Sequence, residues 1–481
     1  MVTSTKGSLF PSKNYIAGKW TDKGKGTLKV LHKYTGKMLA EIPLADHAQL
    51  ERATKAAQAF AKPFAAWSAA KRQAHLQRLH DLLSARRVEF AKLIVQEAGK
   101  PIGYAQNEVE RCLITLSTAA AECVRFGGEV VPVDFGVGEG KTAFTKRIPV
   151  GIVACITPFN FPLNLVLHKV GPALATGCPV LLKPAPQAPL VALAFTALMD
   201  DAGYPKGAIS TFACANDVAE TMVRDNRIGM LSFTGSDMVG WFLKGICGKK
   251  KVALELGGNA AVLVDEDADV AFAAKQCAIG SFLYAGQICI STQRIYVHTK
   301  VFEPFKKALI KETKKLETGD PSKEGVSVGP LIDAGHLQRI ATWVTEAKAA
   351  GSKVLVGGRI KDEAHNIYAP TVLTDVAVDQ KVTCAEAFGP IVVLEEVVDF
   401  DQAIQRTNDS DYGLQAGVFT TRIDHMKKAH EELEVGGVII NNIPGFRVDS
   451  MPYGGIKNSG LGREGIRYAM EEMTEPRLLV Y

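Results

Sequence analysis

The sequence lacks the features that mark several specialised classes of protein. Its first ten residues have no apolar core of the kind found in a signal peptide. There is no long run of lysine and arginine, and a formal net charge of +5 is small for 481 residues, so no nucleic-acid partner is expected. No internal repeat or low-complexity tract is visible. These absences leave an ordinary globular chain, which we expect to work in the cytoplasm.

No stretch of the sequence suits a membrane either. The longest apolar region covers residues 148–182, which is long enough to attract attention. It is interrupted by polar and helix-breaking residues, so it cannot lie in lipid as one helix. The interrupting residues are Pro158, Asn160, Pro162, Asn164, His168 and Lys169. We therefore expect no membrane partner.

The cysteines show no pattern of a disulfide framework or a metal site. Nine are present, an odd number, and they are scattered without repeated CxxC spacing. No metal is therefore expected. In a reducing compartment most free cysteines fill space in the core. Cys289, in the stretch FLYAGQICIS at 282–291, therefore needs evidence of its own to be taken as a nucleophile.

The hydropathy pattern divides the chain into successive parts. Apolar residues at three- and four-residue spacing predict helices between residues 45 and 125, including a helical stretch over 75–100 that ends at a Gly-Lys-Pro sequence. Residues 127–151 are rich in β-branched residues and punctuated by glycine, which predicts a hairpin. A last strand over 476–481 has no obvious partner nearby, and it could pair with the hairpin or with another subunit.

From Val150 onward, short apolar strands alternate with helices. This alternation implies a parallel sheet with crossover helices, the architecture of α/β nucleotide-binding proteins. A second α/β unit is expected from about Ala260 to beyond Gly436, with a helix over 270–283 just before Cys289. In the first unit we expect strands near 151–156, 180–183, 209–212, 230–233 and 252–256, and helices over 163–175, 189–202, 217–224 and 237–247.

Polar residues lie at the ends of two predicted strands. In TPFNFP, at 157–162, two prolines stiffen the turn around Asn160, so its amide would be fixed as a donor to a developing oxyanion. The alternative for Asn160 is a cap for the next helix. Lys183 ends a strand in LKPA, at 182–185, where it could reach a ribose or a phosphate. The alternative for Lys183 is a surface lysine that extends its ammonium group into water.

Two further segments place polar chemistry beside glycines. In FTGS, at 233–236, Gly235 and Ser236 lie where backbone N–H groups at a helix start could receive an anion, although Ser236 is equally a plain helix cap. In LELGG, at 254–258, Glu255 lies inside an apolar strand. Burial would raise the pKa of its carboxyl group toward the range of a general base. The alternative for Glu255 is a salt bridge to a lysine.

Cys289 lies in a connecting loop between a predicted helix and a strand expected over 294–298, and reactive groups tend to lie in such loops. Gly286 lets the backbone turn closely before it. A cysteine thiolate is a nucleophile when donors or positive charge are near. Downstream, EAFGP at 386–390 and PYGGIKNSG at 452–460 are loops that could close over a ligand.

Taken together and in this order, TPFNFP, LKPA, FTGS, LELGG, GQICIS, EAFGP and PYGGIKNSG resemble the aldehyde dehydrogenase superfamily over essentially the whole chain. The resemblance implies that Cys289 attacks the aldehyde carbon, that Asn160 and the Cys289 backbone N–H hold the oxyanion, and that Glu255 activates the water that hydrolyses the thioester. It also implies a coenzyme, NAD or NADP, that accepts the hydride. The coenzyme-binding residues that it implies are Thr157, Pro158, Lys183, Thr234, Gly235, Ser236, Glu386 and Phe388.

The same resemblance implies an aldehyde dehydrogenase fold of the α/β class with three parts. A Rossmann-like coenzyme domain would comprise residues 1–126 and 147–257, and an α/β catalytic domain would comprise residues 258–465. A β oligomerisation element would comprise residues 127–146 and 466–481. Members of the family are usually dimers or tetramers, so we expect a homodimer or a homotetramer.

The loop after Lys183 bears on the choice of coenzyme. Many NAD-preferring relatives have a glutamate where this chain has Pro186, and that carboxylate would repel the 2′-phosphate of NADP. Gln187 beside it is neutral, and no arginine in this loop demands a phosphate. Both NAD and NADP therefore stay open.

Two arginines bear on the substrate. Arg111 and Arg447 lie in segments that line the substrate tunnel in this family. Guanidinium groups match carboxylate and phosphate, so they favour a small polar or anionic aldehyde of the lactaldehyde or glyceraldehyde 3-phosphate type. The alternative is that these arginines pair with acids such as Glu108 or Asp449.

Three other functions are weighed against this reading. A succinic-semialdehyde-type dehydrogenase would use the same chemistry on another anionic aldehyde. A coenzyme A-acylating semialdehyde dehydrogenase is disfavoured, because such enzymes generally lack the glutamate present here as Glu255. A non-catalytic protein on the same fold is disfavoured because Cys289, Glu255 and Asn160 are all present.

Overall fold

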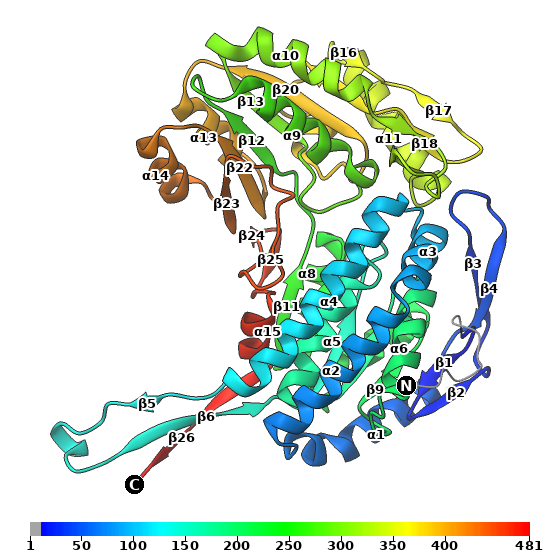
Figure 1. Ribbon diagram of the computed structural model, residues 1–481, viewed down its shortest axis with the longest axis vertical. Helices are drawn as coiled ribbons and strands as arrows, with labels where there is room; N and C mark the ends of the chain where they lie inside the picture. The colour runs from blue at the N-terminus through cyan, green and yellow to red at the C-terminus, as the bar shows by residue number, and fades with distance from the viewer. Residues whose placement is uncertain (1–10) are drawn as a thin grey trace.

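A computed structural model describes residues 11–481 of the chain, which form two α/β units and a projecting β ribbon (Figure 1). The first unit is built on an eight-stranded sheet with the order β2-β1-β9-β8-β7-β10-β11-β25. Its five central strands run parallel, and both edges are antiparallel. The strands are β1 (Asn14–Ile16), β2 (Lys19–Thr21), β7 (Ile152–Ile156), β8 (Val180–Lys183), β9 (Ile209–Thr211), β10 (Ile228–Thr234), β11 (Lys251–Glu255) and β25 (Gly460–Leu461).

Helices cover both faces of this sheet, because its strands alternate their side chains between two apolar cores. Along β7, Val153 and Cys155 belong to one core cluster, and Ile152 and Ala154 belong to the other. The first core is completed by α2 (Ala69–Ala85), α3 (Arg87–Ala98), α4 (Ile102–Arg125), α5 (Asn164–Thr176) and α6 (Leu190–Asp201). The second is completed by α1 (His47–Ala65), α7 (Asn216–Arg224) and α8 (Asp237–Ile246).

The second unit has a seven-stranded sheet with the order β16-β19-β20-β13-β12-β22-β23. Every neighbouring pair is parallel except β16 with β19. Its strands are β12 (Ala261–Val264), β13 (Arg294–His298), β16 (Lys353–Val356), β19 (Thr371–Thr374), β20 (Ile391–Val397), β22 (Gln415–Phe419) and β23 (Gly437–Ile440). Its helices are α9 (Val270–Phe282), α10 (Thr299–Lys314), α11 (Ala334–Ala349), α12 (Lys381–Cys384), α13 (Phe400–Asn408) and α14 (Ile423–Glu432).

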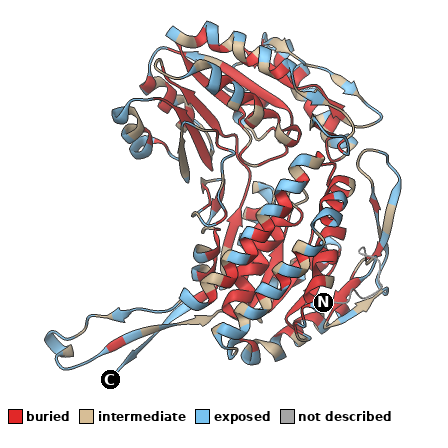
Figure 2. Cartoon of the chain, viewed as in Figure 1, coloured by how far each residue is buried: buried red, intermediate tan, exposed pale blue. Residues whose placement is uncertain are grey.

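The ribbon joins two distant parts of the chain. Strand β6 (Ala143–Pro149) pairs antiparallel with β26 (Thr474–Val480), from Ala143 opposite Val480 to Pro149 opposite Thr474. The short strand β5 (Val130–Val131) pairs with the other edge of β6. The terminal strand thus pairs with the expected hairpin. The ribbon extends away from both units, and most of it is exposed (Figures 1 and 2).

The remaining elements are short. They are the strands β3 (Thr27–Leu31), β4 (Met38–Pro43), β14 (Glu317–Thr318), β15 (Val326–Val328), β17 (Ile360–Asp362), β18 (Ile367–Tyr368), β21 (Tyr412–Gly413) and β24 (Ile456–Lys457), the helix α15 (Ile466–Glu472), and the 3-10 turns η1 (Gly136–Gly138) and η2 (Leu283–Gly286). No helix among residues 11–481 combines the length and the apolarity needed to cross a bilayer.

The alternation of strands and helices from residue 150 to 256 is confirmed, with boundaries shifted by at most two residues. The helical stretch over 75–100 is instead two helices, α2 and α3, which meet at Arg86. The break has a packing reason. Leu79 and Leu83 before it and Phe90 and Ile94 after it are all fully buried in one core, and a turn at Arg86 lets both segments reach that core.

Candidate active site

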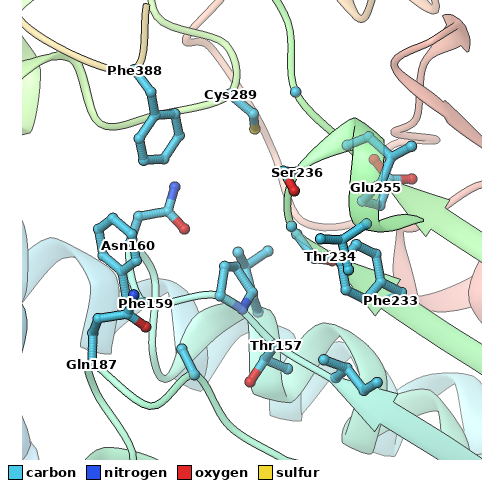
Figure 3. A pocket seen from close by; sticks show the side chains of 18 of the residues that line it. Thr157, Phe159, Asn160, Gln187, Phe233, Thr234, Ser236, Glu255, Cys289 and Phe388 are labelled. Atoms are coloured by element: carbon cyan, nitrogen blue, oxygen red, sulfur yellow. The ribbon is translucent and has the colours of Figure 1, made fainter. Parts of the chain in front are cut away.

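A cavity of about 460 Å³ lies where the two units meet, beyond the carboxyl ends of the parallel strands β7, β8 and β10. Open α/β sheets bind their ligands at this edge. Twelve of the residues predicted from the sequence line this cavity, and several of them point into it in Figure 3. The twelve are Thr157, Pro158, Asn160, Lys183, Thr234, Gly235, Ser236, Glu255, Cys289, Glu386, Phe388 and Arg447.

The loop that carries Cys289 is held in an unusual backbone conformation. Tyr284, Ala285 and Gly286 follow one another with φ values of 50°, 55° and 68°, in the left-handed region. Two non-glycine residues in this region store strain, which collects at functional sites when the surroundings enforce it. Gly286 has a further constraint, because a Cβ there would lie 2.1 Å from the Gly389 carbonyl oxygen. The turn directs the chain into the cavity at Cys289.

Gln287 anchors this loop, and sequence reasoning missed it. Its side-chain amide donates to the Pro330 carbonyl at 3.2 Å, and its side-chain oxygen accepts from the Ile332 N–H at 2.9 Å. Its backbone carbonyl accepts from Asn160 Nδ2 at 3.0 Å. The residue is fully buried. Gln287 therefore ties the cysteine loop to the turn that carries Asn160 and to the segment before α11. Its place in GQICIS was visible, but its partners were not.

Asn160 is not the cap of the following helix. Its side-chain oxygen accepts from the Phe161 N–H at 3.1 Å. The N–H groups at the start of α5 that have no acceptor within the helix instead donate to Glu108 of α4. The distances are 3.0 Å from Leu163 and 3.1 Å from Asn164. One N–H of the Asn160 amide is used by Gln287, so the other is free to donate into the cavity.

Glu255 stands at the end of β11 and is only 3% exposed. Neither carboxyl oxygen has a hydrogen-bond partner in the described part of the chain, so the lysine salt bridge considered above does not form. Burial raises the pKa of Glu255 well above its usual range, and the charge of Glu464 adds to this, while Arg447 and Lys169 oppose it. A carboxylate with a raised pKa is a stronger base once it is ionised, which suits Glu255 to general-base catalysis.

Among residues 11–481, one side chain hydrogen-bonds to the Cys289 sulfur, and this is Tyr453, whose hydroxyl lies 3.1 Å away. Burial raises the pKa of the Cys289 thiol to about 12, while the Tyr453 hydrogen bond and the charge of Arg447 act in the opposite direction. Tyr453 lies in the PYGG segment, which was recognised as a motif without a role for its tyrosine. Its position in space was not predictable from that motif.

A buried ion network supports this wall of the cavity. The Arg447 guanidinium pairs with Glu464 at 3.1 Å, and Lys169 of α5 pairs with the same carboxylate at 2.9 Å. Burial alone would raise the pKa of Glu464, but Lys169 and Arg447 outweigh it and hold that pKa well below its usual range. The Nε of Arg447 is buried and has no partner among residues 11–481. Arg447 therefore presents an incompletely satisfied cation to the cavity.

Arg111 takes a different position. It pairs with Asp449 through two nitrogens and is absent from the residues that line the cavity. Asp449 also meets His168 of α5 at 2.8 Å. Burial lowers the pKa of His168, so this imidazole is neutral near pH 7. Arg111 thus has no direct place in the cavity wall. It contacts Asp449, which lies in the same loop as Arg447.

The other half of the cavity offers groups that suit a dinucleotide. Lys183 is buried at the end of β8, and its burial lowers the pKa of its ammonium group. The Thr234 hydroxyl is buried and has no partner in the described residues. Ser236 occupies the N-cap position of α8, yet its side chain makes no capping hydrogen bond. Unpaired polar groups beside a helix N-terminus fit a ribose and a pyrophosphate.

Glu386 and Phe388 face this half from the second unit. The Glu386 carboxylate accepts from the Gly258 N–H at 3.1 Å. It lies so close to Gly257 that a Cβ there would be 2.4 Å from one of its oxygens. Burial raises the pKa of Glu386 to about 7. His336 and Arg339 of α11 also line the cavity, and sequence reasoning missed both.

Known proteins resemble this chain over nearly its whole length. The sequence model described as "Aldehyde dehydrogenase family" matches residues 20–479. The chain is 44% identical over 468 residues to a 3-sulfolactaldehyde dehydrogenase of Priestia aryabhattai, which covers 97% of each protein.

Two solved structures share the fold. Aldehyde dehydrogenase 21 of Physcomitrella patens, in complex with the reaction product succinate, has a TM-score of 0.94 and 40% identity, over 98% of each chain. The glyceraldehyde-3-phosphate dehydrogenase GapN of Methanocaldococcus jannaschii, complexed with NADP, has a TM-score of 0.91 and 35% identity. That match covers 96% of this chain and 100% of the other.

Proposed function

The chain belongs to the aldehyde dehydrogenase family and oxidises an aldehyde with NAD or NADP, and we propose that its substrate is a small aldehyde with an anionic group. The observation that carries this proposal is the buried, incompletely paired guanidinium of Arg447 in the cavity wall. Its guanidinium lines the same cavity as Cys289, its side chain is only 6% exposed, and its Nε has no partner in residues 11–481. A buried donor of this kind gains most from an acceptor on the ligand.

The charge balance of this wall supports an anion. Three cations, Lys169, Arg111 and Arg447, lie in the two linked networks, and only Asp449 and Glu464 are ionised carboxylates there. Burial raises the pKa of Glu255, which favours the neutral form of its carboxyl group. The excess positive charge would attract a carboxylate, sulfonate or phosphate. The names of the relatives are consistent with this, since 3-sulfolactaldehyde, succinate and glyceraldehyde 3-phosphate all carry such a group.

In the proposed mechanism, the Cys289 thiol loses its proton to solvent, and the thiolate attacks the aldehyde carbon to form the thiohemiacetal anion. The free N–H of Asn160 and the backbone N–H of Cys289 donate hydrogen bonds to the resulting oxyanion. The coenzyme, when bound, supplies the acceptor for the hydride that leaves this carbon. A thioester on Cys289 remains. Glu255, once it has lost its own proton to solvent, takes a proton from a water molecule, which attacks the thioester and releases the carboxylate product and the Cys289 thiolate.

We assign coenzyme binding to residues already placed in the cavity. Lys183 and Glu386 would hold the hydroxyl groups of the two riboses. Thr234, Gly235 and Ser236 would lie against the nicotinamide and the pyrophosphate, with Thr157 and Pro158 beside them and Phe388 next to the nicotinamide ribose. In the same proposal, residues 1–126 and 147–257 form the coenzyme domain and residues 258–465 form the catalytic domain.

The ribbon supports a further part of the proposal, a homodimer or homotetramer built through residues 127–146 and 466–481. Leu478, Leu479 and Val480 of β26 and the adjoining Tyr481 are all exposed. Clustered exposed apolar residues mark protein interaction sites. A location in the cytoplasm is proposed with it, because all nine cysteines are free thiols and Cys289 must stay reduced to act.

The experiment that tests the substrate compares initial rates of NADH and NADPH formation. The aldehydes are 3-sulfolactaldehyde, glyceraldehyde 3-phosphate, succinic semialdehyde, lactaldehyde and hexanal. An anionic aldehyde should have the highest kcat/KM. Removing the guanidinium in Arg447→Met should lower that value about 100-fold, and it should lower the value for lactaldehyde by a much smaller factor, because Arg447 also favours the Cys289 thiolate.

Arg422→Met is the matched control, because Arg422 pairs with Asp424 on an exposed helix and should leave both rates unchanged. If lactaldehyde or hexanal is the best substrate of the wild type, the anionic substrate is wrong. A coenzyme A-dependent rate would favour the acylating alternative, which the presence of Glu255 disfavours.

A further inference from the structure

Tyr453 is held rigidly beside the nucleophile. The residue is only 3% exposed, and its backbone exchanges two hydrogen bonds with Glu464, at 3.1 and 2.7 Å. The Arg447 guanidinium carbon lies 3.7 Å from the centre of the Tyr453 ring, on its face. The ring is therefore fixed by its own backbone and by the stacked guanidinium. Its hydroxyl lies 3.1 Å from the Cys289 sulfur.

We propose that Tyr453 is a catalytic residue, whose hydroxyl donates a hydrogen bond to the Cys289 sulfur whenever that sulfur carries negative charge. A phenolic O–H is a donor, and a thiolate can only accept. A hydrogen bond with an ionised partner is roughly twice as strong as a neutral one. The bond would therefore stabilise the thiolate before it attacks the aldehyde. It would stabilise the same thiolate again when the thioester is hydrolysed and the sulfur leaves.

No proton transfer from Tyr453 is required. Burial raises the pKa of Tyr453 well above its usual range, and the nearby Cys289 adds to this, so the phenol keeps its proton throughout. The proton of the Cys289 thiol therefore leaves to solvent. Tyr453 lowers the free energy of the thiolate that remains.

The charged groups around the sulfur make this contribution important. Burial disfavours the thiolate most, and the nearby Glu386 and Glu255 carboxyl groups disfavour it further. Arg447 and Tyr453 favour it. Within residues 11–481, Tyr453 supplies the only side-chain hydrogen bond to the Cys289 sulfur. Replacing the hydroxyl by hydrogen would leave the thiolate without a direct side-chain donor.

The inference rests on Cys289 as the nucleophile of the proposed function, but its test uses no aldehyde. The full-length enzyme without coenzyme is alkylated by iodoacetamide across a range of pH, and modification of Cys289 is followed by mass spectrometry. The rate reports the thiolate fraction. Tyr453→Phe removes one oxygen and keeps the ring under Arg447. At a fixed pH, the alkylation rate of Cys289 should fall about 10- to 100-fold in this variant, because the thiolate fraction falls by that factor.

Tyr15→Phe is the matched control, because Tyr15 is a buried tyrosine whose hydroxyl donates to Asp200, in the first unit. Its alkylation profile should equal that of the wild type. A profile of Tyr453→Phe that also equals the wild type would overturn the proposal. Tyr453→Leu separates the hydroxyl from the ring. If only the leucine variant changes the profile, ring packing is the cause and the proposal is wrong.

A second measurement needs no substitution at Tyr453. In wild-type enzyme labelled with 13Cζ-tyrosine, the resonance that alkylation of Cys289 perturbs identifies Tyr453 among eleven tyrosines. That resonance should shift at the pH where alkylation titrates, and the shift should vanish in Cys289→Ala. A resonance that ignores this titration would overturn the proposal. Both outcomes are independent of the aldehyde that the enzyme oxidises.

Discussion

The guanidinium of Arg111 and the carboxylate of Asp449 face each other through two contacts, Nη2 to Oδ1 at 2.7 Å and Nε to Oδ2 at 3.2 Å. This fork joins helix α4 to the loop before Tyr453, across 338 positions of sequence. The Asp449 carboxylate therefore balances the charge of Arg111 within the protein. Of the two guanidinium groups, only that of Arg447 lines the cavity, and the Arg111 pair helps to hold the loop from which Arg447 extends.

Asp449→Asn should lower the free energy of unfolding by about 2 kcal/mol at pH 7, because two charge-assisted hydrogen bonds lose their acceptor charge. Burial raises the pKa of Asp449, but the bonds from His168 and Arg111 outweigh it and hold that pKa well below its usual range. A group whose pKa is lowered by folding stabilises the protein above its unfolded pKa, about 3.9. The difference should therefore be constant near neutral pH and shrink as the pH falls below about 4, in urea titrations. Asp424→Asn, at an exposed pair, should show almost no difference.

Asn160→Ala should lower kcat by about 100- to 1,000-fold, because it removes a donor to the oxyanion. Asn160→Asp keeps the shape and removes the donor, so it should be equally slow. Stopped-flow measurement of the first turnover checks this. A first turnover as fast as that of the wild type would remove Asn160 from the oxyanion site.

Glu255→Gln should release one equivalent of NADH or NADPH per site in a burst and then turn over about 100-fold or more slower than the wild type. The thioester should form without Glu255, but its hydrolysis should be slow because no base activates the water. In the wild type, kcat should rise with pH as the buried Glu255 loses its proton, because its pKa is raised. A slow single phase without a burst would place Glu255 before hydride transfer instead.

Glu386 should make coenzyme binding depend on pH. Burial raises its pKa to about 7. The ionised carboxylate accepts hydrogen bonds from ribose hydroxyls better than the protonated acid does. The Kd for NAD or NADP, measured by fluorescence titration, should therefore fall as the pH rises through about 7. In Glu386→Gln this dependence should disappear, and its persistence would assign the titration to another group.

Val480→Lys should weaken assembly if the ribbon is the interface between subunits. Val480 is 47% exposed on β26, and Val378, in a loop of the second unit, has the same exposure. Val378→Lys is therefore a matched control. Mass photometry of the wild type should give a dimer or tetramer, and only Val480→Lys should shift it toward smaller species. An unchanged mass in both variants would exclude the end of β26 from the interface.

The sequence was informative where chemistry is local. The alternation of short apolar strands and helices predicted the five central strands of the first sheet closely, because these strands are buried on both faces and each carries its own apolar run. The cavity-lining positions of Asn160, Lys183 and Glu255 were predictable because motifs at strand ends in an open α/β sheet converge at one edge.

Other features depend on contacts between distant segments. Tyr453 meets Cys289 across 164 positions, and Glu108 satisfies the start of α5 from another helix. The break at Arg86 follows from the packing of Leu83 and Phe90 in one core, and the spacing of apolar residues runs through it unchanged. No local pattern contains this information, because each contact is decided by how whole helices and loops pack.

The loop from Asn441 to Tyr453 carries both the group proposed to select the substrate and the group proposed to tune the nucleophile. Arg447 lies on the ring of Tyr453, and the hydroxyl of that same ring reaches Cys289. Laboratory evolution of this enzyme toward an uncharged aldehyde would naturally begin by replacing Arg447. Each such replacement would also loosen the ring that faces the sulfur. Variants with a broadened substrate range should therefore have a less reactive Cys289 thiol. Compensating substitutions should accumulate around Tyr453.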